Sequence, residues 1–214
     1  MNNSPKIVFF GLVALVIIIF AFILINSGGI SPDSYSTAPK DAVLKTVDVP
    51  SDFNFRESAL TSNDARGSVP IEDWAKFKFS EGYRTGFTRN VSNIDELKKA
   101  KPLMITSVVA LFETPEGASQ NLEYNISESK LYEDTYAYQT KLTSISEINV
   151  GKLGDESRGF ILSLVDDNGV PAIGVSIQVR KGNYIVQIDE LAYDAIGLKE
   201  DAVRLAKISL NRIT

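Results

Sequence analysis

One uninterrupted apolar run near the N-terminus constrains this chain more than any other feature. Residues 7–25 read IVFFGLVALVIIIFAFILI, nineteen positions without a charge or a proline. A helix of that length rises roughly 28 Å, close to the thickness of a bilayer's hydrocarbon core, and it pairs its own backbone groups, as lipid requires. We therefore predict a transmembrane helix over residues 7–26, in contact with the lipid bilayer, preceded by a short tail over residues 1–6.

A cleaved signal peptide is the alternative interpretation of this run. The apolar core of a signal peptide is usually shorter, and only the small residues 27–29 offer a weak cleavage site. The chain contains no cysteine, so neither a lipidated N-terminal cysteine nor S-palmitoylation can anchor it. These observations favour a retained signal-anchor helix.

Basic residues around the run indicate its orientation. Lys6 precedes the run, and the next basic residue is Lys40. Because basic residues are retained on the cytoplasmic side, we expect a single-pass protein of the cell membrane with a cytoplasmic N-terminus. The C-terminal domain would then be extracytoplasmic.

The rest of the chain divides into a linker and a domain. Nine of the fourteen residues 27–40 are Gly, Pro, Ser or Thr, which predicts a flexible linker. Residues 41–214 are long enough for one domain with its own core. The chain beyond the apolar run carries 21 basic and 27 acidic residues, a net charge of −6, which argues against nucleic acid as a partner.

Apolar patterning over residues 41–214 predicts an α+β fold with a mainly antiparallel sheet flanked by helices. The predicted strands are 53–55, 83–91, 104–113, one within 138–150, and an antiparallel meander of 159–165, 173–180 and 183–191. The predicted helices are a short one opening at residues 68–70, then 93–100, 115–130 and 198–213.

Several details of this prediction concern single residues. We expect Ser68 to cap the first helix and Ile71, Trp74 and Phe77 to share one buried face. Residues 56–67 are predicted to be a polar loop, and Gly82 to interrupt the pattern before the next strand. In the middle strand of the meander, residues Gly174, Ser176, Gln178 and Arg180 alternate with apolar residues, which predicts one buried face and one wet or lightly covered face.

The residue types limit the chemistry that is available. There is no histidine and no cysteine, so an enzyme would have to rely on carboxylates, Lys, Tyr or Ser. Residues 127–130 match the S-x-x-K pattern, but without its companion motifs an exposed polar helix face is the better interpretation. The acidic pairs Asp189-Glu190 and Glu200-Asp201 are adjacent in sequence and point in different directions. We predict no catalytic residues.

Two acidic turns are candidates for metal sites. Residues 166–169 read DDNG but lack the spacing of a calcium loop, which favours a hairpin turn. Residues 154–157 read GDES and are predicted to form a tight turn, with a functional acidic edge as the alternative. We therefore predict no bound metal and no cofactor.

Five aromatic residues lie within a span of fourteen positions. The set comprises Trp74, Phe77, Phe79, Tyr83 and Phe87. A contribution to the core, where a helix meets a strand, is the favoured interpretation. The alternative is a groove for a sugar, lipid or peptide, with Trp74, Phe77, Tyr83 and Phe87 as the ligand-binding residues.

A succession of segments carries a family resemblance. In order they are DVPSDF, DWAKFKFSEGYRTGFTR, ITSVVALFETPEGA, VGKLGDES, VRKGNYIVQI and LAKISLNRI, spanning residues 48–213. The chain resembles a group of uncharacterised, membrane-anchored extracytoplasmic proteins of prokaryotes, and its layout is similar to the PsbP-like α+β fold. The resemblance implies a fold and a location, but it supplies no catalytic residues.

The sequence leaves more than one function open. The first hypothesis is a non-catalytic binding or accessory module that contacts an envelope protein or a small ligand. The second is an envelope hydrolase using carboxylates or a Ser-Lys pair, and the third is a structural or sensory subunit that associates through its membrane helix. Clustered carboxylates with perturbed pKa values in a cleft would favour the enzyme.

Overall fold

The computed structural model describes residues 36–66, 69–89, 102–129, 136–137, 140–165 and 169–214. The predicted transmembrane helix, residues 27–35 of the predicted linker, Ser68 and the predicted helix over 93–100 lie outside the described residues. Among the helices in the described part of the chain, none combines the length and the apolar character that crossing a bilayer requires.

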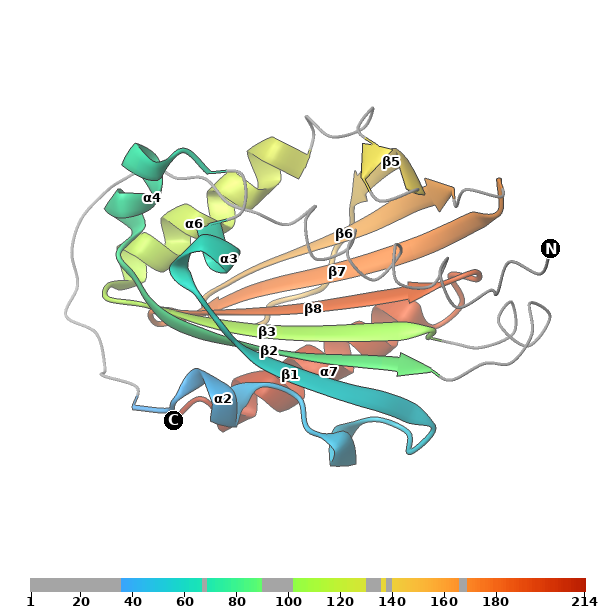
Figure 1. The fold of residues 1–214 in the computed structure, drawn as a ribbon, viewed down its shortest axis with the longest axis horizontal. Helices are drawn as coiled ribbons and strands as arrows, with labels where there is room; N and C mark the ends of the chain where they lie inside the picture. Colours follow the sequence, from blue (N-terminus) through green and yellow to red (C-terminus); the bar gives the residue numbers. More distant parts are fainter. Residues whose placement is uncertain (1–35, 67–68, 90–101, 130–135, 138–139, 166–168) are drawn as a thin grey trace, which may run out of the picture.

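One antiparallel sheet of eight strands forms the centre of the domain (Figure 1). Its spatial order is β1-β2-β3-β8-β7-β6-β5-β4, so the strand nearest the C-terminus, β8, is inserted between β3 and β7. The strands are β1 Phe53–Leu60, β2 Phe79–Arg89, β3 Met104–Phe112, β4 Tyr136–Ala137, β5 Thr140–Glu147, β6 Glu156–Val165, β7 Pro171–Lys181 and β8 Tyr184–Ala192.

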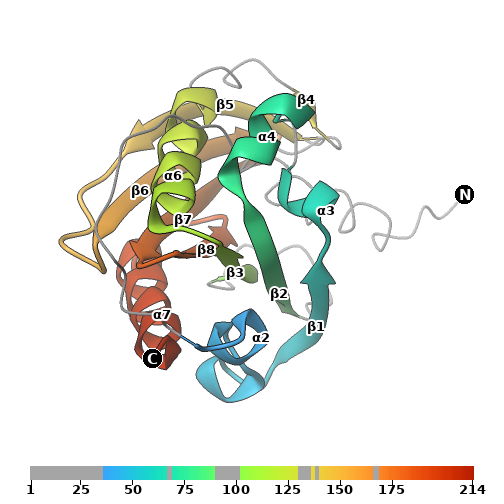
Figure 2. The same ribbon diagram turned by 90° about the vertical axis from the view of Figure 1, so that its left-hand side faces the viewer.

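Helices cover both faces of this sheet (Figures 1 and 2). One side, here called the α7 face, carries the short helix α2 (Pro39–Ala42), the 3-10 turn η1 (Thr46–Asp48) and α7 (Leu198–Arg212). The other side, the α6 face, carries α3 (Ser62–Arg66), α4 (Ile71–Phe77) and α6 (Pro115–Ser129). The predicted α+β class with an antiparallel sheet is confirmed.

The best-predicted elements are those with strong local signals. The apolar run over residues 104–113 forms the inner strand β3, and the meander forms β6, β7 and β8. Helix α6 begins at Pro115, and the Thr114 hydroxyl accepts a hydrogen bond of 3.1 Å from the backbone N–H of Gly117. That contact is the N-terminal cap expected from the sequence.

The predicted loop over residues 56–67 is wrong. Strand β1 continues to Leu60 and pairs with β2 along its whole length, and α3 follows directly. Strand β1 lies at the edge of the sheet, and six of its eight residues are exposed. Its sequence therefore lacks the apolar alternation that marks a half-buried strand. Pairing with β2 supplies the order that the local pattern does not show.

Two further predictions in this region are also wrong. Gly82 does not interrupt a strand, because β2 begins at Phe79 and Gly82 pairs with both Leu60 and Ala110. Ile71 does not share the buried face of α4, since it is 70% exposed while Trp74 and Phe77 are buried. The apolar spacing was correct for the last two residues only, because the helix begins at Ile71 and its first turn projects away from the sheet.

The face of β7 that was predicted to be wet or lightly covered is buried in its middle part. Ser176 and Gln178 are both completely inaccessible to solvent. Helix α6 contacts β3, β8 and β7 and covers this part of the sheet, which the alternation within one strand could not indicate. The polar residues of β7 therefore lie inside the domain.

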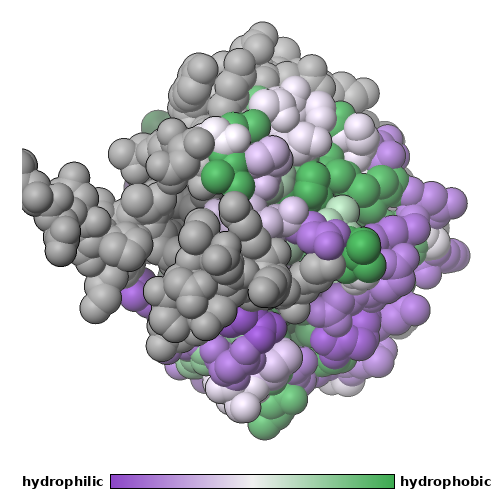
Figure 3. All heavy atoms as spheres, turned by 90° about the vertical axis from the view of Figure 1, so that its right-hand side faces the viewer, coloured by the Kyte–Doolittle hydropathy of each residue, from purple (hydrophilic) through white to green (hydrophobic). Residues whose placement is uncertain are grey.

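Apolar packing differs between the two faces of the sheet. The α7 face has one large cluster, in which β7 and β8 pack against α2 and α7. The α6 face has two smaller clusters, one beneath α4 and α6 and one at the opposite end of the same strands. The view onto the end of the domain in Figure 3 shows hydrophobic residues in green among hydrophilic residues in purple.

The two ends of the described chain lie together (Figure 1). The backbone N–H of Ser36 donates a 3.1 Å hydrogen bond to the carbonyl oxygen of Thr214. The Thr37 hydroxyl lies 3.2 Å from the carbonyl oxygen of Arg212, and the Tyr184 hydroxyl donates a 2.6 Å hydrogen bond to the Thr37 carbonyl oxygen. Contacts with the domain therefore begin before residue 41.

Candidate functional site

The four aromatic residues proposed for a ligand groove lie on opposite sides of the sheet. Trp74 and Phe77 pack together on the α6 face, with ring centroids 5.2 Å apart. Phe87 is buried on the α7 face, where Tyr83 packs at the edge of the same cluster. Because the sheet separates the two pairs, they do not line one groove, and the packing matches the core interpretation.

A band of polar side chains crosses the α6 face. The strand register places Thr106 opposite Asp189, and Asp189 opposite Ser176. In the next row on this face, two residues along each strand, Gln187 lies opposite Gln178. The first row continues through Gly86 to Arg56, and the second passes the apolar Val108 before it reaches Arg84 and Ser58. The polar band consists of Arg56, Ser58, Arg84, Thr106, Ser176, Gln178, Gln187 and Asp189.

The polar band separates the two apolar clusters of this face. Along β8 the side chains facing α6 are Ile185 in the first cluster, Gln187 and Asp189 in the band, and Leu191 in the second cluster. Its inner members are buried, with Gln187 the most accessible at 6%. A buried polar strip through a core costs stability unless its groups are hydrogen-bonded, so its position calls for an explanation.

Asp189 is the only acidic residue of the band. Its carboxylate accepts hydrogen bonds of 3.1 and 2.9 Å from the side-chain amide of Gln187. Burial raises the pKa of Asp189 from 3.8 to about 7, while the neighbouring Ser176 hydroxyl and the Gln187 amide partly oppose that shift. Near neutral pH this carboxyl group therefore exists in both protonation states, and it can donate or accept a hydrogen bond.

Asn121 adds a polar group from the helix above the band. Helix positions 118, 121 and 122 share one face, and Ala118 and Leu122 pack on the sheet, so Asn121 lies on the sheet-facing side of α6. Its side chain is completely buried, and neither its amide nitrogen nor its amide oxygen has a hydrogen-bond partner among the described residues. Such an orphaned amide is costly, and a hydrogen-bonding ligand would relieve that cost.

The band becomes accessible toward β1 and β2. Arg56 and Ser58 are exposed, and Arg84 is partly buried. A Cβ atom added at Gly86 would meet no atom of a described residue within 4 Å, so no described residue fills the space above this glycine. Gly86 lies opposite Thr106 on one side and Arg56 on the other. The band thus runs from an open basic end to a buried acidic end.

The second buried carboxyl group lies on the other side of the sheet. Glu190 follows Asp189 in β8 and faces α7, where it is completely buried. Burial, together with the nearby carboxylate of Asp201, raises the pKa of Glu190 to about 9, although Arg204 opposes the shift. As predicted, the adjacent acids Asp189 and Glu190 point in different directions, and they do not form a catalytic pair.

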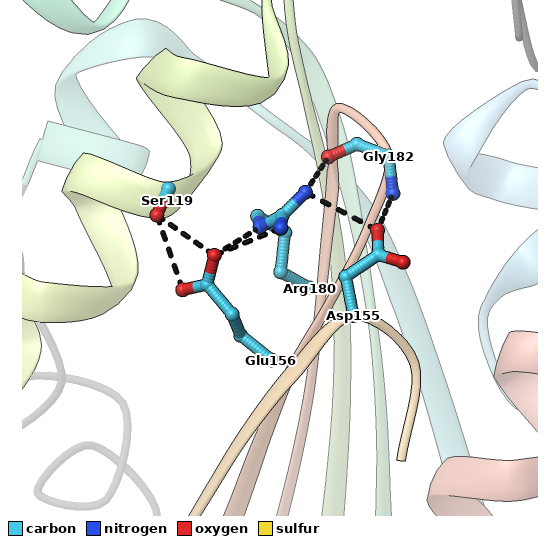
Figure 4. A network of polar contacts seen from close by, with 5 residues as sticks. All are labelled: Ser119, Asp155, Glu156, Arg180 and Gly182. Carbon is cyan, nitrogen blue, oxygen red and sulfur yellow. Dashed lines mark hydrogen bonds and ion pairs between the residues drawn. The ribbon is translucent and has the colours of Figure 1, made fainter. Parts of the chain in front are cut away.

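A separate polar network ties α6 to the end of the sheet (Figure 4). Glu156 accepts hydrogen bonds from the Ser119 hydroxyl at 2.9 Å and from Nε of Arg180 at 2.8 Å. The same guanidinium contacts Asp155 at 3.2 Å and the Gly182 carbonyl oxygen at 2.9 Å. Every charged group of this network has a partner within the domain, so the GDES turn is a structural joint.

The remaining sequence candidates lie outside the described residues or carry no described side chain. Asp166, Asp167, Asn168 and Lys130 are outside, and for Ser127 only the backbone of α6 is described. Gly169 has φ +75°, as a glycine in the predicted turn requires. Within the described part of the chain, no group of three acidic residues lies close enough together to hold a metal ion.

Sequence reasoning missed the polar band. The band arises from two neighbouring strands together. Ser176 and Gln178 on β7 lie opposite Asp189 and Gln187 on β8. Each strand alone shows an alternation typical of a sheet with one wet face. Only the combined register and the cover of α6 show that these polar residues face one another in the interior.

The fold defines a class: a single α+β domain whose antiparallel sheet has helices on both faces. Among solved structures, the extracellular domain of PknH from Mycobacterium tuberculosis shares this architecture, with a TM-score of 0.56 and 11% sequence identity. The match covers 86% of this chain and 98% of that one. No protein-family model matches the chain, and no curated protein matches it. At 11% identity the likeness shows a common fold.

Proposed function

We propose that this chain is a membrane-anchored extracytoplasmic accessory or sensor domain, without catalytic activity, that binds a small polar ligand in the polar band. The observation that carries the proposal is the buried amide of Asn121, which faces the sheet without a partner among the described residues. It lies on the helix that covers a carboxyl group poised between two protonation states. A ligand with hydroxyl, amino or carbonyl groups would satisfy both.

Two observations support the proposed location. The apolar run over residues 7–25 is long enough to anchor the domain, and the fold is shared with a domain described as extracellular. The resemblance to anchored proteins with a PsbP-like fold stays a prediction from the sequence. An envelope protein as an additional partner also stays a prediction.

The arrangement of carboxyl groups favours binding over hydrolysis. Glycoside hydrolysis uses two carboxylates on one substrate, but Asp189 and Glu190 lie on opposite faces of the sheet. Glu190 is also completely covered on the α7 face. A single carboxyl group among amides and hydroxyls is typical of a ligand-binding site.

The ligand proposal can be tested with Asn121→Leu. The full chain, extracted from membranes in mild detergent, would be analysed by mass spectrometry for small molecules that copurify with it. We expect the original chain to retain a small polar molecule that Asn121→Leu loses. The variant should unfold at the same temperature or higher, because it replaces an orphaned amide with an apolar group.

A different result would identify Asn121 as a structural residue. If Asn121→Leu lowered the free energy of unfolding and both proteins carried the same molecules, the polar band would not be a ligand site. Location needs its own measurement, namely protease digestion of intact cells and of lysed cells. Digestion of the C-terminal domain only after lysis would contradict the extracytoplasmic location.

A further inference from the structure

Arg84 occupies an unusual electrostatic position at the open end of the polar band. It is partly buried, and it makes no hydrogen bond or ion pair with any described residue. Burial lowers the pKa of Arg84 from its ordinary value, and the carboxylate of Asp64 only partly offsets that effect. Asp64 itself accepts hydrogen bonds of 3.0 and 2.7 Å from the backbone and hydroxyl of Thr61.

The surroundings of Arg84 leave room for a ligand. Its neighbour on the same face of β2 is Gly86, above which no described residue fills the space. Arg56 lies opposite Gly86 on β1, so a second guanidinium borders the same position. Planar guanidinium groups bind carboxylates and phosphates through paired hydrogen bonds, and partial burial strengthens such contacts.

We infer that the polar band takes a small organic anion carrying hydroxyl or amino groups, with its carboxylate or phosphate on Arg84 above Gly86 and its hydrogen-bond donors toward Thr106 and Asp189. This inference rests on the proposed function and names the chemical class of its ligand. The register places Gly86 opposite Thr106 and Thr106 opposite Asp189. Arg84 lies two positions along β2 on the same face, opposite Val108.

Charge and distance set the size of this ligand. The backbones of β2 and β8 are separated by two strand spacings, about 10 Å, and the side chain of Arg84 spans part of that distance. An amino acid or a sugar acid therefore fits the length. The net charge of −6 on the residues that follow the apolar run disfavours polyanions, so the ligand is a small anion rather than a polymer.

The test compares probes that differ in one chemical group. Gluconate, glutamate and glucose 6-phosphate carry an anionic group with hydroxyl or amino groups, sorbitol lacks the anionic group, and acetate lacks the hydroxyls. Binding to the purified full chain in detergent would be measured by isothermal titration calorimetry and by the shift in unfolding temperature. We expect at least one of the three anionic probes to bind, and sorbitol and acetate to bind at least tenfold more weakly.

Arg84→Gln should weaken that binding at least tenfold. Its unfolding temperature without probe should be unchanged or raised, because the substitution removes a desolvated charge. Arg204→Gln is the matched control, since Arg204 is an exposed arginine of α7 on the other side of the sheet, and it should leave binding unchanged.

Each other outcome has a defined meaning. If sorbitol bound as tightly as gluconate and Arg84→Gln had no effect, the anionic ligand class would be wrong. Binding that still depended on Asn121 would then leave the proposed small-ligand function in place. If none of the probes bound at millimolar concentration, the anion inference would be wrong, and the copurification experiment would decide the proposed function separately.

Discussion

Arg212, near the end of the chain, forms a two-pronged salt bridge with Asp48, near the start of the domain. The guanidinium nitrogens Nη1 and Nη2 lie 2.8 Å from the two carboxylate oxygens, and Nη1 also donates a 2.9 Å hydrogen bond to the Val43 carbonyl oxygen. The Asp48 side chain is only 9% exposed. This paired contact joins the last helix to the first turn across 164 residues of sequence.

Removing that guanidinium should destabilise the domain. We expect Arg212→Met to lower the free energy of unfolding by about 3 kcal/mol, because it leaves a poorly accessible carboxylate without its cation. Arg204→Met is the control, since Arg204 is exposed and its half-buried partner Asp201 lies three positions earlier on the same helix, and it should cost at most about 0.5 kcal/mol. Equal effects in urea titrations would show that the terminal contact adds nothing.

Stability should fall as pH rises through the range in which Asp189 titrates. The folded protein holds the proton of this carboxyl up to about pH 7, whereas the unfolded chain releases it near pH 3.8. The folded state therefore binds more protons between these values, and the contribution is fully present at low pH and lost by about pH 7. Urea titrations would give the free energy of unfolding at pH 5 and at pH 8. We expect Asp189→Asn to reduce the difference between these two values by about 2 to 4 kcal/mol.

Glu190 extends the same trend to higher pH. Its pKa of about 9 means that the folded state keeps this proton while the unfolded chain loses it near pH 4.5. Asp189→Asn should therefore leave a residual slope that Glu190→Gln removes. A pH profile that none of the buried variants alters would contradict the raised pKa values.

The joint between α6 and the sheet should depend on Arg180. In Arg180→Met the carboxylates of Asp155 and Glu156 lose their shared cation, and we expect a loss of about 1 to 2 kcal/mol of stability. Because Ser119 contacts Glu156, hydrogen exchange of α6 amides should also become faster. Arg158→Met is the matched control, because Arg158 makes only an exposed pair with Glu147. Unchanged exchange in α6 would separate the helix from this network.

Two glycines allow the cost of a steric clash to be separated from the cost of backbone strain when alanine replaces them. Gly151 and Gly154 both have positive φ, +71° and +59°, so an alanine costs backbone strain at either position. A Cβ at Gly154 would also clash with the carbonyl oxygen of Arg180, while one at Gly151 would meet no atom of the described residues within 4 Å. We expect Gly154→Ala to cost about 1 to 3 kcal/mol more than Gly151→Ala in thermal unfolding.

Local sequence patterns were enough to predict the fold class and the elements with the strongest local signals. The β6-β7-β8 meander, the inner strand β3 and the capped helix α6 each carry their signal within a few residues: alternation, a continuous apolar run, or Thr-Pro at a helix start. Such signals arise from neighbours along one strand or helix, so they survive without knowledge of the rest of the fold. The edge strand β1 has no such signal, since its order comes from pairing with β2.

The candidate site depends on contacts that no single segment encodes. Insertion of β8 between β3 and β7 sets Asp189 between Thr106 and Ser176, and α6, which carries the buried Asn121, covers these three strands. The amino-acid order specifies which residues alternate on a strand, but burial depends on which layer covers that face. For this reason the polar face of β7, expected to be wet or lightly covered, lies inside the domain, and the four residues of the alternative aromatic groove lie on two sides of the sheet.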